Sequence, residues 1–210
     1  MNYIKIDTED VCNGNGLRVV IWLSSCNHHC YNCQNPQTWN PDSGIPFDEN
    51  AEEELFRELD KDYISGLTLT GGDPLHENNL DKVLDIVTKF RKRYGHTQDV
   101  VCDGEKSHNI LSENSDKSRV FSDKTIWLYS GYTWEDIWDE SIHYHIKTQE
   151  NLKRGRWRRQ QIIKLCDVFI DGRYIDSQRD ITLKFKGSCN QRVINVQESL
   201  KQNKVILYCD

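Results

Sequence analysis

Three of the eight cysteines lie close together in the chain, and their spacing suggests a site for an inorganic centre. Cys26, Cys30 and Cys33 fall within eight residues, in the segment CNHHCYNC. The other five are scattered singly, at positions 12, 102, 166, 189 and 209. This distribution does not resemble a disulfide framework, whereas clustered thiols are typical of metal ligands. We therefore interpret Cys26, Cys30 and Cys33 as ligands of one centre.

Two kinds of centre suit three thiolates at this spacing. A structural zinc ion takes four protein ligands, and either His28 or His29 could complete a Cys3His site. A 4Fe–4S cluster held by three cysteines leaves one iron without a protein ligand. An open coordination position is typical of a catalytic centre. The spacing by itself leaves both interpretations open.

Length and charge exclude several classes of protein. The chain has 210 residues and a formal net charge of −6, which fits one domain over residues 1–210 with a sizeable core. A net acidic chain is a poor candidate for binding nucleic acid without sequence preference. The sequence contains no apolar run near the ~20 residues of a membrane span, and its first ten residues lack the apolar core of a signal peptide. We expect a cytoplasmic protein with no membrane association.

Strand and helix patterns alternate along the chain, which predicts an α/β fold. Such alternation favours parallel strands joined by crossover helices. A closed eight-stranded barrel usually needs ~250 residues, so we expect a partial (βα) barrel or an open sheet. Residues 96–125 are polar and aperiodic and are interpreted as a surface insertion. The patterns predict strands at 4–6, 19–23, 64–70, 125–129 and 168–170, a strand-like segment at 183–187, and helices at 48–59, 79–94, 133–138 and up to about 165.

Three turns follow predicted strands, and each carries residues suited to a binding site. They are the cysteine segment, Gly71-Gly72-Asp73-Pro74 and Ser130-Gly131-Tyr132. In partial barrels and open α/β sheets, ligands bind at the carboxyl ends of the strands. We therefore expect the three turns to line one mouth.

Several segments together resemble a known family. Cys-x3-Cys-x2-Cys after an early strand is the signature of radical S-adenosylmethionine enzymes, and the wider pattern resembles the activating proteins of anaerobic ribonucleotide reductase. The most specific segment is KFKGSCNQRVINV at 184–196. The resemblance covers most of the chain in order, except for 96–125. Its other segments are residues 11–18, 22–26, 35–39, 69–75, 127–132 and 171–174.

The resemblance implies a radical SAM fold and a defined reaction. Cys26, Cys30 and Cys33 would hold three irons of a 4Fe–4S cluster, and the open iron would bind S-adenosylmethionine (SAM). With an electron from a reducing donor, SAM would be cleaved to methionine and a 5′-deoxyadenosyl radical. The implied target is a glycine on the large reductase subunit. Beyond the cluster, we expect no catalytic side chain.

The resemblance also implies cofactor contacts outside the cysteine segment. They are Gly71, Gly72, Asp73, Ser130, Tyr132 and Asn190. The glycines lack a Cβ and could approach the methionine part closely, although a plain strand-to-helix turn has the same pattern. Ser130 and Tyr132 would line the nucleoside side, and a buried Tyr132 with a bonded hydroxyl is an equal alternative. Asn190 could contact cofactor or partner, or close the barrel edge.

Two rival functions remain at this stage. A small radical enzyme of the deazapurine-forming type shares the cysteine motif but does not explain the 184–196 segment. A Cys3His zinc interaction module would hold stoichiometric zinc. The basic stretch 147–159 is interpreted first as a solvated helix face, then as a docking surface, and last as a nucleic-acid site. Cys189 is expected to be a small buried residue.

Overall fold

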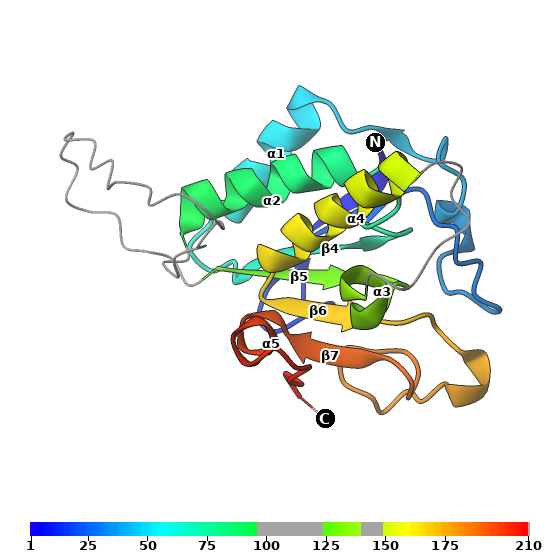
Figure 1. Ribbon diagram of the computed structural model, residues 1–210. Helices are drawn as coiled ribbons and strands as arrows, with labels where there is room; N and C mark the ends of the chain where they lie inside the picture. Colours follow the sequence, from blue (N-terminus) through cyan, green and yellow to red (C-terminus); the bar gives the residue numbers. More distant parts are fainter. Residues whose placement is uncertain (96–123, 140–148, 210) are drawn as a thin grey trace.

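Seven strands form one mixed, open sheet within the residues that the computed structural model describes, 1–95, 124–139 and 149–209 (Figure 1). The order across the sheet is β3-β1-β2-β4-β5-β6-β7, with β3 and β7 at its two edges. The strands are β1 (Asn2–Asp10), β2 (Arg18–Leu23), β3 (Ile45–Pro46), β4 (Gly66–Gly71), β5 (Thr125–Tyr129), β6 (Val168–Asp171) and β7 (Arg192–Asn195).

The prediction of parallel strands holds for the centre of the sheet and not for its edges. Strands β2, β4, β5 and β6 are parallel, whereas β1, β3 and β7 pair antiparallel with their neighbours. A parallel connection needs a crossover of a dozen or more residues, and only residues 11–17 join β1 to β2. The short link therefore forces an antiparallel pair at that edge.

Helices α1, α2 and α4 cover one face of the sheet in Figure 1. Capping groups fix where two of the helices begin: the Asp48 carboxylate accepts a hydrogen bond from the Ala51 amide, and Thr133 forms a capping box with Asp136. The helices are α1 (Glu49–Leu59), α2 (Leu80–Tyr94), α3 (Trp134–Trp138), α4 (Gln149–Lys164) and α5 (Val196–Gln202), with short 3-10 turns η1 (Pro36–Thr38) and η2 (Asp176–Gln178).

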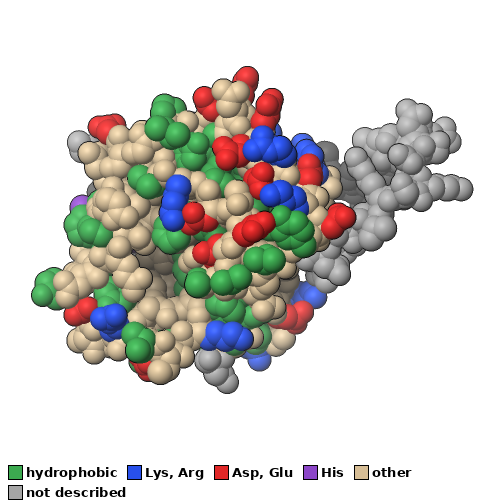
Figure 2. Space-filling model, turned by 180° about the vertical axis from the view of Figure 1, so that it is seen from behind, with side chains coloured by type: hydrophobic (Ala, Val, Ile, Leu, Met, Phe, Trp, Pro, Cys, Tyr) green, Lys and Arg blue, Asp and Glu red, His purple; other side chains and the backbone are tan. Residues whose placement is uncertain are grey.

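The two faces of the sheet differ in chemistry because successive side chains point to opposite sides. Toward the helices the strands present aliphatic side chains such as Leu67 and Leu128, which join the main core. On the other side they present Trp22, Thr70 and Tyr129, which line a cavity. Figure 2 views the molecule from behind Figure 1 and shows this face hollowed, with acidic and basic side chains interspersed. The alternation thus separates a packed face from a binding face.

The strand-like segment at 183–187 is not a strand, and that prediction was wrong. Phe185 adopts a left-handed backbone with φ of 62°, which an extended strand does not allow. Its ring packs edge-on against Trp127, with the ring centroids 4.8 Å apart. The edge strand is instead β7, which begins at Arg192. Alternating apolar residues alone did not distinguish a strand from a loop anchored by one aromatic ring.

Two other predicted segments fall largely or partly outside the described residues. Of the predicted insertion at 96–125, only Lys124 and Thr125 are described, and Thr125 already belongs to β5. In the basic stretch 147–159, Arg159 is buried and donates a hydrogen bond to the Leu75 carbonyl (2.9 Å), while Arg158 pairs with Asp81. A fully solvated face therefore does not describe these two arginines. Within the described residues no helix combines the length and apolar character needed to cross a bilayer.

Arg18 is a fully buried cation that joins the amino-terminal ends of β2, β4 and β5. Its guanidinium donates to the carbonyls of Leu67 (2.7 Å) and Thr125 (2.8 Å), and Nε donates to Thr68 Oγ1 (2.7 Å). It also lies 5.4 Å from the centre of the Trp127 ring. Burial lowers the pKa of Arg18 to about 10. Its donors therefore satisfy buried backbone oxygens on two other strands, β4 and β5.

Gly14 has no side chain, and Arg18 occupies the space that a side chain there would fill. A Cβ at this position would lie 2.6 Å from Arg18 Cδ and 3.0 Å from the Trp127 ring, and the backbone φ is +135°. Both features disfavour any residue with a side chain. The glycine-rich turn before β2 therefore serves the packing of a buried arginine.

We predict that Arg18→Met lowers the free energy of unfolding by about 3 kcal/mol, because it leaves buried carbonyls without donors. Urea unfolding followed by circular dichroism measures the change. Arg57→Met is the matched control, since Arg57 is exposed on α1, and we expect its effect to stay within about 0.5 kcal/mol. Equal stability of the two variants would contradict the role given to Arg18.

Candidate functional site

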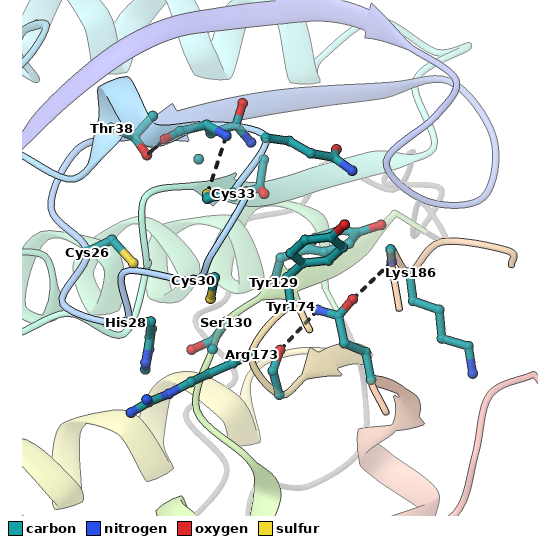
Figure 3. A pocket seen from close by; sticks show the side chains of 18 of the residues that line it. Cys26, His28, Cys30, Cys33, Thr38, Tyr129, Ser130, Arg173, Tyr174 and Lys186 are labelled. Atoms are coloured by element: carbon teal, nitrogen blue, oxygen red, sulfur yellow. Dashed lines mark hydrogen bonds between the residues drawn. The ribbon is translucent and has the colours of Figure 1, made fainter. Parts of the chain in front are cut away.

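A cavity of about 490 Å³ opens at the carboxyl ends of the central parallel strands. The cysteine loop, defined here as residues 24–35 after β2, forms one wall, and the Gly71-Gly72 and Ser130-Gly131 turns form others. Figure 3 shows the side chains of the three cysteines and of Ser130 around one space. The prediction that three turns share one mouth is therefore confirmed.

All three clustered cysteines line this cavity. The loop curls because Ser25, His29 and Asn32 adopt left-handed backbone angles, with φ of 76°, 44° and 54°. The Cys26 amide donates to the Trp39 carbonyl (3.2 Å), which fixes the start of the loop. Cys26 is buried, whereas Cys30 and Cys33 are half-buried.

The electrostatics of the thiols suit ligands of a cationic centre. Burial raises the pKa of Cys26 to about 12 and also raises the pKa of Cys30. Buried thiols of this kind stay protonated unless a nearby positive charge stabilises the thiolate. Bound iron supplies such a charge, so that binding releases protons.

The donor set fits an iron–sulfur cluster better than a single zinc ion. Three thiols face one cavity from one loop, and cysteine thiolates are the usual ligands of iron–sulfur clusters. Among residues 1–95, 124–139 and 149–209, no three Cys, His, Asp or Glu side chains are gathered as one metal ion requires. A cluster offers a separate iron to each thiolate, so its ligands spread more widely.

Asp73 lies behind the cavity wall, where its carboxylate joins three loops. It is 1% exposed and is not among the residues that line the cavity. Its two oxygens accept hydrogen bonds from the Ser130 hydroxyl (2.8 and 3.0 Å) and from the amides of Leu75 (2.8 Å) and Gly131 (3.3 Å). They also contact His28 Nε2 at 2.5 Å. The carboxylate therefore ties the cysteine loop to the other two turns of the mouth.

His28 also lines the cavity, although the sequence suggested it only as a zinc ligand. Its ring packs edge-on against Tyr132, with centroids 4.8 Å apart, and a Cβ at Gly131 would lie 2.3 Å from it. The ring therefore fills the space that Gly131 leaves. His28 Nε2 also contacts the carboxylate of Asp73, which lies 45 residues away in sequence. Through these contacts His28 anchors the cysteine loop to the Ser130-Gly131-Tyr132 turn. No local sequence pattern indicates a pair so far apart.

Gly71 and Gly72 line the cavity, and the neighbouring chain already requires them to be glycine. A Cβ on Gly71 would lie 2.4 Å from the Leu23 amide nitrogen, and one on Gly72 would lie 2.6 Å from the Ser25 carbonyl oxygen. Neither distance is tolerated. The close approach of the backbone at the end of β2 and at the start of the cysteine loop thus accounts for both glycines, and their predicted approach to a cofactor stays a prediction.

The remaining predicted site residues differ in their relation to the cavity. Ser130 lines it, whereas Tyr132 and Asn190 do not belong to its lining. Tyr132 lies under the Arg159 guanidinium, 4.5 Å from its ring centre, and burial raises the pKa of its hydroxyl to about 12. Asn190 Nδ2 donates to the Arg173 carbonyl (2.8 Å). Tyr132 thus packs behind the cavity wall, against His28 and Arg159, and Asn190 holds the backbone of the 172–191 connection.

Several lining residues were not singled out from the sequence, although some lie in the quoted family segments. Cys12 also lines the cavity but is separate from the cysteine loop. Cys189 is exposed, so its expected burial was wrong: it sits on the surface of the 172–191 connection. The other lining residues include Thr38, Tyr129, Arg173, Tyr174 and Lys186.

We predict that Asp73→Asn lowers the free energy of unfolding by about 2 kcal/mol, because an amide offers one acceptor oxygen where the carboxylate offers two. We also expect weaker retention of bound iron, since the cysteine loop loses its anchor through His28. Urea unfolding and iron analysis measure the two effects. Asp42→Asn, at an exposed position, should change neither. Unchanged stability in Asp73→Asn would contradict the linking role.

Comparison with known proteins agrees with the geometry. The family model described as a 4Fe-4S single cluster domain matches residues 12–120 and 114–194. The chain is 33% identical over 195 residues to a protein of Enterobacteria phage T4, covering 92% of this chain and 93% of that one. It is 32% identical to a protein of Pasteurella multocida (strain Pm70), covering 91% and 95%, and 28% identical to one of Escherichia coli (strain K12), covering 92% and 97%.

All three relatives carry the same name, and their similarity extends over nearly the whole of each chain. The family model adds a single 4Fe–4S cluster, in agreement with the three thiols that face one cavity. The chain belongs to the family of anaerobic ribonucleoside-triphosphate reductase-activating proteins and carries a 4Fe–4S domain.

Proposed function

We propose that this chain is a radical SAM enzyme that generates a glycyl radical on the large subunit of an anaerobic ribonucleoside-triphosphate reductase. One observation carries the proposal: three thiols from one loop and two turns at the ends of strands line the same cavity. The relatives of this chain are named as reductase-activating proteins, which agrees with that arrangement. We further propose that the open sheet is a partial (βα) barrel of the radical SAM type, in one domain over residues 1–210.

In this proposal Cys26, Cys30 and Cys33 hold the 4Fe–4S cluster. When bound there, the cluster and SAM would supply the chemistry: one-electron reduction of the sulfonium would give methionine and a 5′-deoxyadenosyl radical, which would take a hydrogen atom from a glycine of the partner. The protein's own residues bind and orient the reactants and exclude water.

We propose different roles for residues on the cavity surface and for residues behind it. Gly71, Gly72 and Ser130 lie on the cavity surface and are proposed to border bound SAM. Asp73 holds the turns that carry them, through Ser130 and Gly131. We therefore propose that Asp73 and Tyr132 act by positioning the walls of the site. The electron donor is a reducing protein or small molecule that must reach the cluster.

Anaerobically purified protein should be brown and contain about four irons and four sulfides per chain. Cys30→Ala should lose most of the iron, because one iron loses its thiolate. Cys12→Ala is the matched control, since Cys12 lines the same cavity outside the cysteine loop, and it should retain the cluster. Colourless protein with one tightly bound zinc would instead support the zinc module.

The reduced protein, mixed with SAM and the large reductase subunit under argon, should produce a glycyl radical signal in electron spin resonance. Cys30→Ala should produce none, since it lacks the complete cluster. The absence of a signal from the wild-type protein would overturn the proposed target. Stoichiometric conversion of a free small molecule without the reductase subunit would support the deazapurine-type alternative.

A further inference from the structure

A second hollow, of about 620 Å³, adjoins the cavity that contains the three cysteines. It lies on the connection between β6 and β7, residues 172–191, which we call the flap. Three residues line both spaces: Arg179, Asp180 and Ile181. The other residues that line the hollow are Ser177, Gln178 and Cys189. The hollow therefore extends the cavity outward, while the clustered thiols line only the inner space.

Hydrogen bonds within the flap hold the walls of the hollow in place. The two arms of the flap are joined by a bridge between Arg179 and Ser188 and by the Cys189 amide, which donates to the Gln178 carbonyl (2.9 Å). The buried hydroxyl of Ser188 also accepts a hydrogen bond from the Ile175 amide (3.2 Å). A surface whose backbone is already ordered loses less conformational entropy when a partner binds.

The flap is also joined to the cysteine loop at the rim of the cavity. Asp176 on the flap accepts hydrogen bonds from Asn32 Nδ2 (3.2 Å) on the cysteine loop and from the Tyr174 hydroxyl (2.8 Å). Both segments lie beyond the same ends of the central strands (Figure 1). The rim therefore consists of two segments that are tied together.

Exposed apolar side chains lie on both segments of this rim. Ile181 is 85% exposed and Tyr31 is 77% exposed, more than any other large apolar side chain in the described part of the chain. Ile175, 39% exposed, is next to Asp176, just as Tyr31 is next to Asn32. Single exposed apolar residues are common, whereas a group of them beside a cavity is typical of an interaction site.

The flap is basic although the whole chain is acidic. It carries four basic and two acidic residues, in a chain whose net charge is −6. Both acidic side chains already accept hydrogen bonds, Asp176 as described above and Asp180 from the amide (2.8 Å) and hydroxyl (2.7 Å) of Thr182. Among the described residues, no carboxylate forms an ion pair with Arg179 or Lys186, which line the cavity. These charges fit a partner that presents carboxylates.

The inner cavity and the outer hollow suit different parts of one reaction. A cluster on the three thiols and SAM would occupy the inner space, and the target atom must reach them there. A glycine within a protein loop has chain on both sides of it, so that chain must cross the rim. The outer hollow offers such a path, and the side chains of Ser177 and Gln178 can form hydrogen bonds with a peptide backbone.

We propose that the outer hollow and the apolar rim form a docking groove for an extended loop of the reductase large subunit, the loop that carries the target glycine. An apolar side chain of this loop packs on Ile181, and an acidic side chain pairs with Arg179. Tyr31 and Ile175 extend the apolar surface to the cysteine loop. The inference rests on the proposed function, since it takes the large subunit as the substrate.

The first test is the dissociation constant between the cluster-loaded, full-length protein with SAM and the large subunit, measured anaerobically by biolayer interferometry. Ile181→Asp should raise it about tenfold, because a carboxylate replaces an apolar contact. Ile181→Leu keeps that contact and should stay near the wild-type value. Ile45→Asp is the matched control, since it makes the same change at an exposed position on β3. Unchanged affinity in Ile181→Asp overturns the docking groove.

The second test concerns the charge of the groove. The wild-type dissociation constant should rise as salt is increased from about 0.05 M to about 0.3 M. Arg179→Glu should weaken binding about tenfold at low salt and reduce this dependence on salt. Arg57→Glu, at an exposed position on α1, is the control for the change in net charge. The same loss in both variants shows a general charge effect and contradicts the pairing with Arg179.

Glycyl radical formation separates this inference from the proposed function. Ile181→Asp should raise the KM for the large subunit about tenfold, with wild-type iron content and a similar rate at saturating subunit. A lower rate at saturation with an unchanged KM would place Ile181 in the reaction and overturn the docking role. Wild-type protein that binds the subunit through Ile181 and forms no glycyl radical would contradict the proposed function and still support the groove.

A second copy of this chain is the other occupant that the test can detect. Size-exclusion chromatography over a range of concentrations should show no dimer that depends on Ile181. Dimers of the wild-type protein that Ile181→Asp abolishes would assign the groove to self-association and overturn the docking of the large subunit.

Discussion

The buried carboxylate of Asp73 is the interaction on which the rest of the site depends. A carboxylate removed from water must be surrounded by donors, and Asp73 finds them on three segments that are distant in sequence. Ser130 and Gly131 come from the end of β5, Leu75 from its own turn, and His28 from the cysteine loop. Because these donors cannot leave without exposing an unsatisfied charge, the three turns keep a fixed relative position.

The sheet supplies the two surfaces that this arrangement needs. On one face, aliphatic residues pack against α1, α2 and α4 and form the larger core. On the other face, the same strands present residues that line the cavity, such as Thr70 and Tyr129. At the opposite ends of these strands, Arg18 on β2 holds β4 and β5 through the carbonyls of Leu67 and Thr125 and through the Thr68 hydroxyl. The strands are thus held at both ends, by a buried cation at one and a buried anion at the other.

Much of this fold could be predicted from local pattern. The apolar runs of β2 and β5, the caps at Asp48 and Thr133 and the glycines at the end of β4 all agree with their sequence signals. The prediction failed at 183–187, where apolar alternation suggested a strand but Phe185 turns its ring onto Trp127. It also failed at Cys189, because residue type alone does not determine burial in a surface connection.

The sequence by itself determined the ligand types, their spacing and the family resemblance, because these depend on residues close together along the chain. Only the tertiary structure decided which distant groups meet. It pairs His28 with Asp73 and brings Asn190 to the backbone of Arg173 rather than to the cavity surface. It also showed that Gly71 and Gly72 are needed where the backbone of Leu23 and Ser25 approaches them. Such contacts follow from how strand ends and loops pack in three dimensions, and residues 17 to 58 positions apart carry no local signal of them.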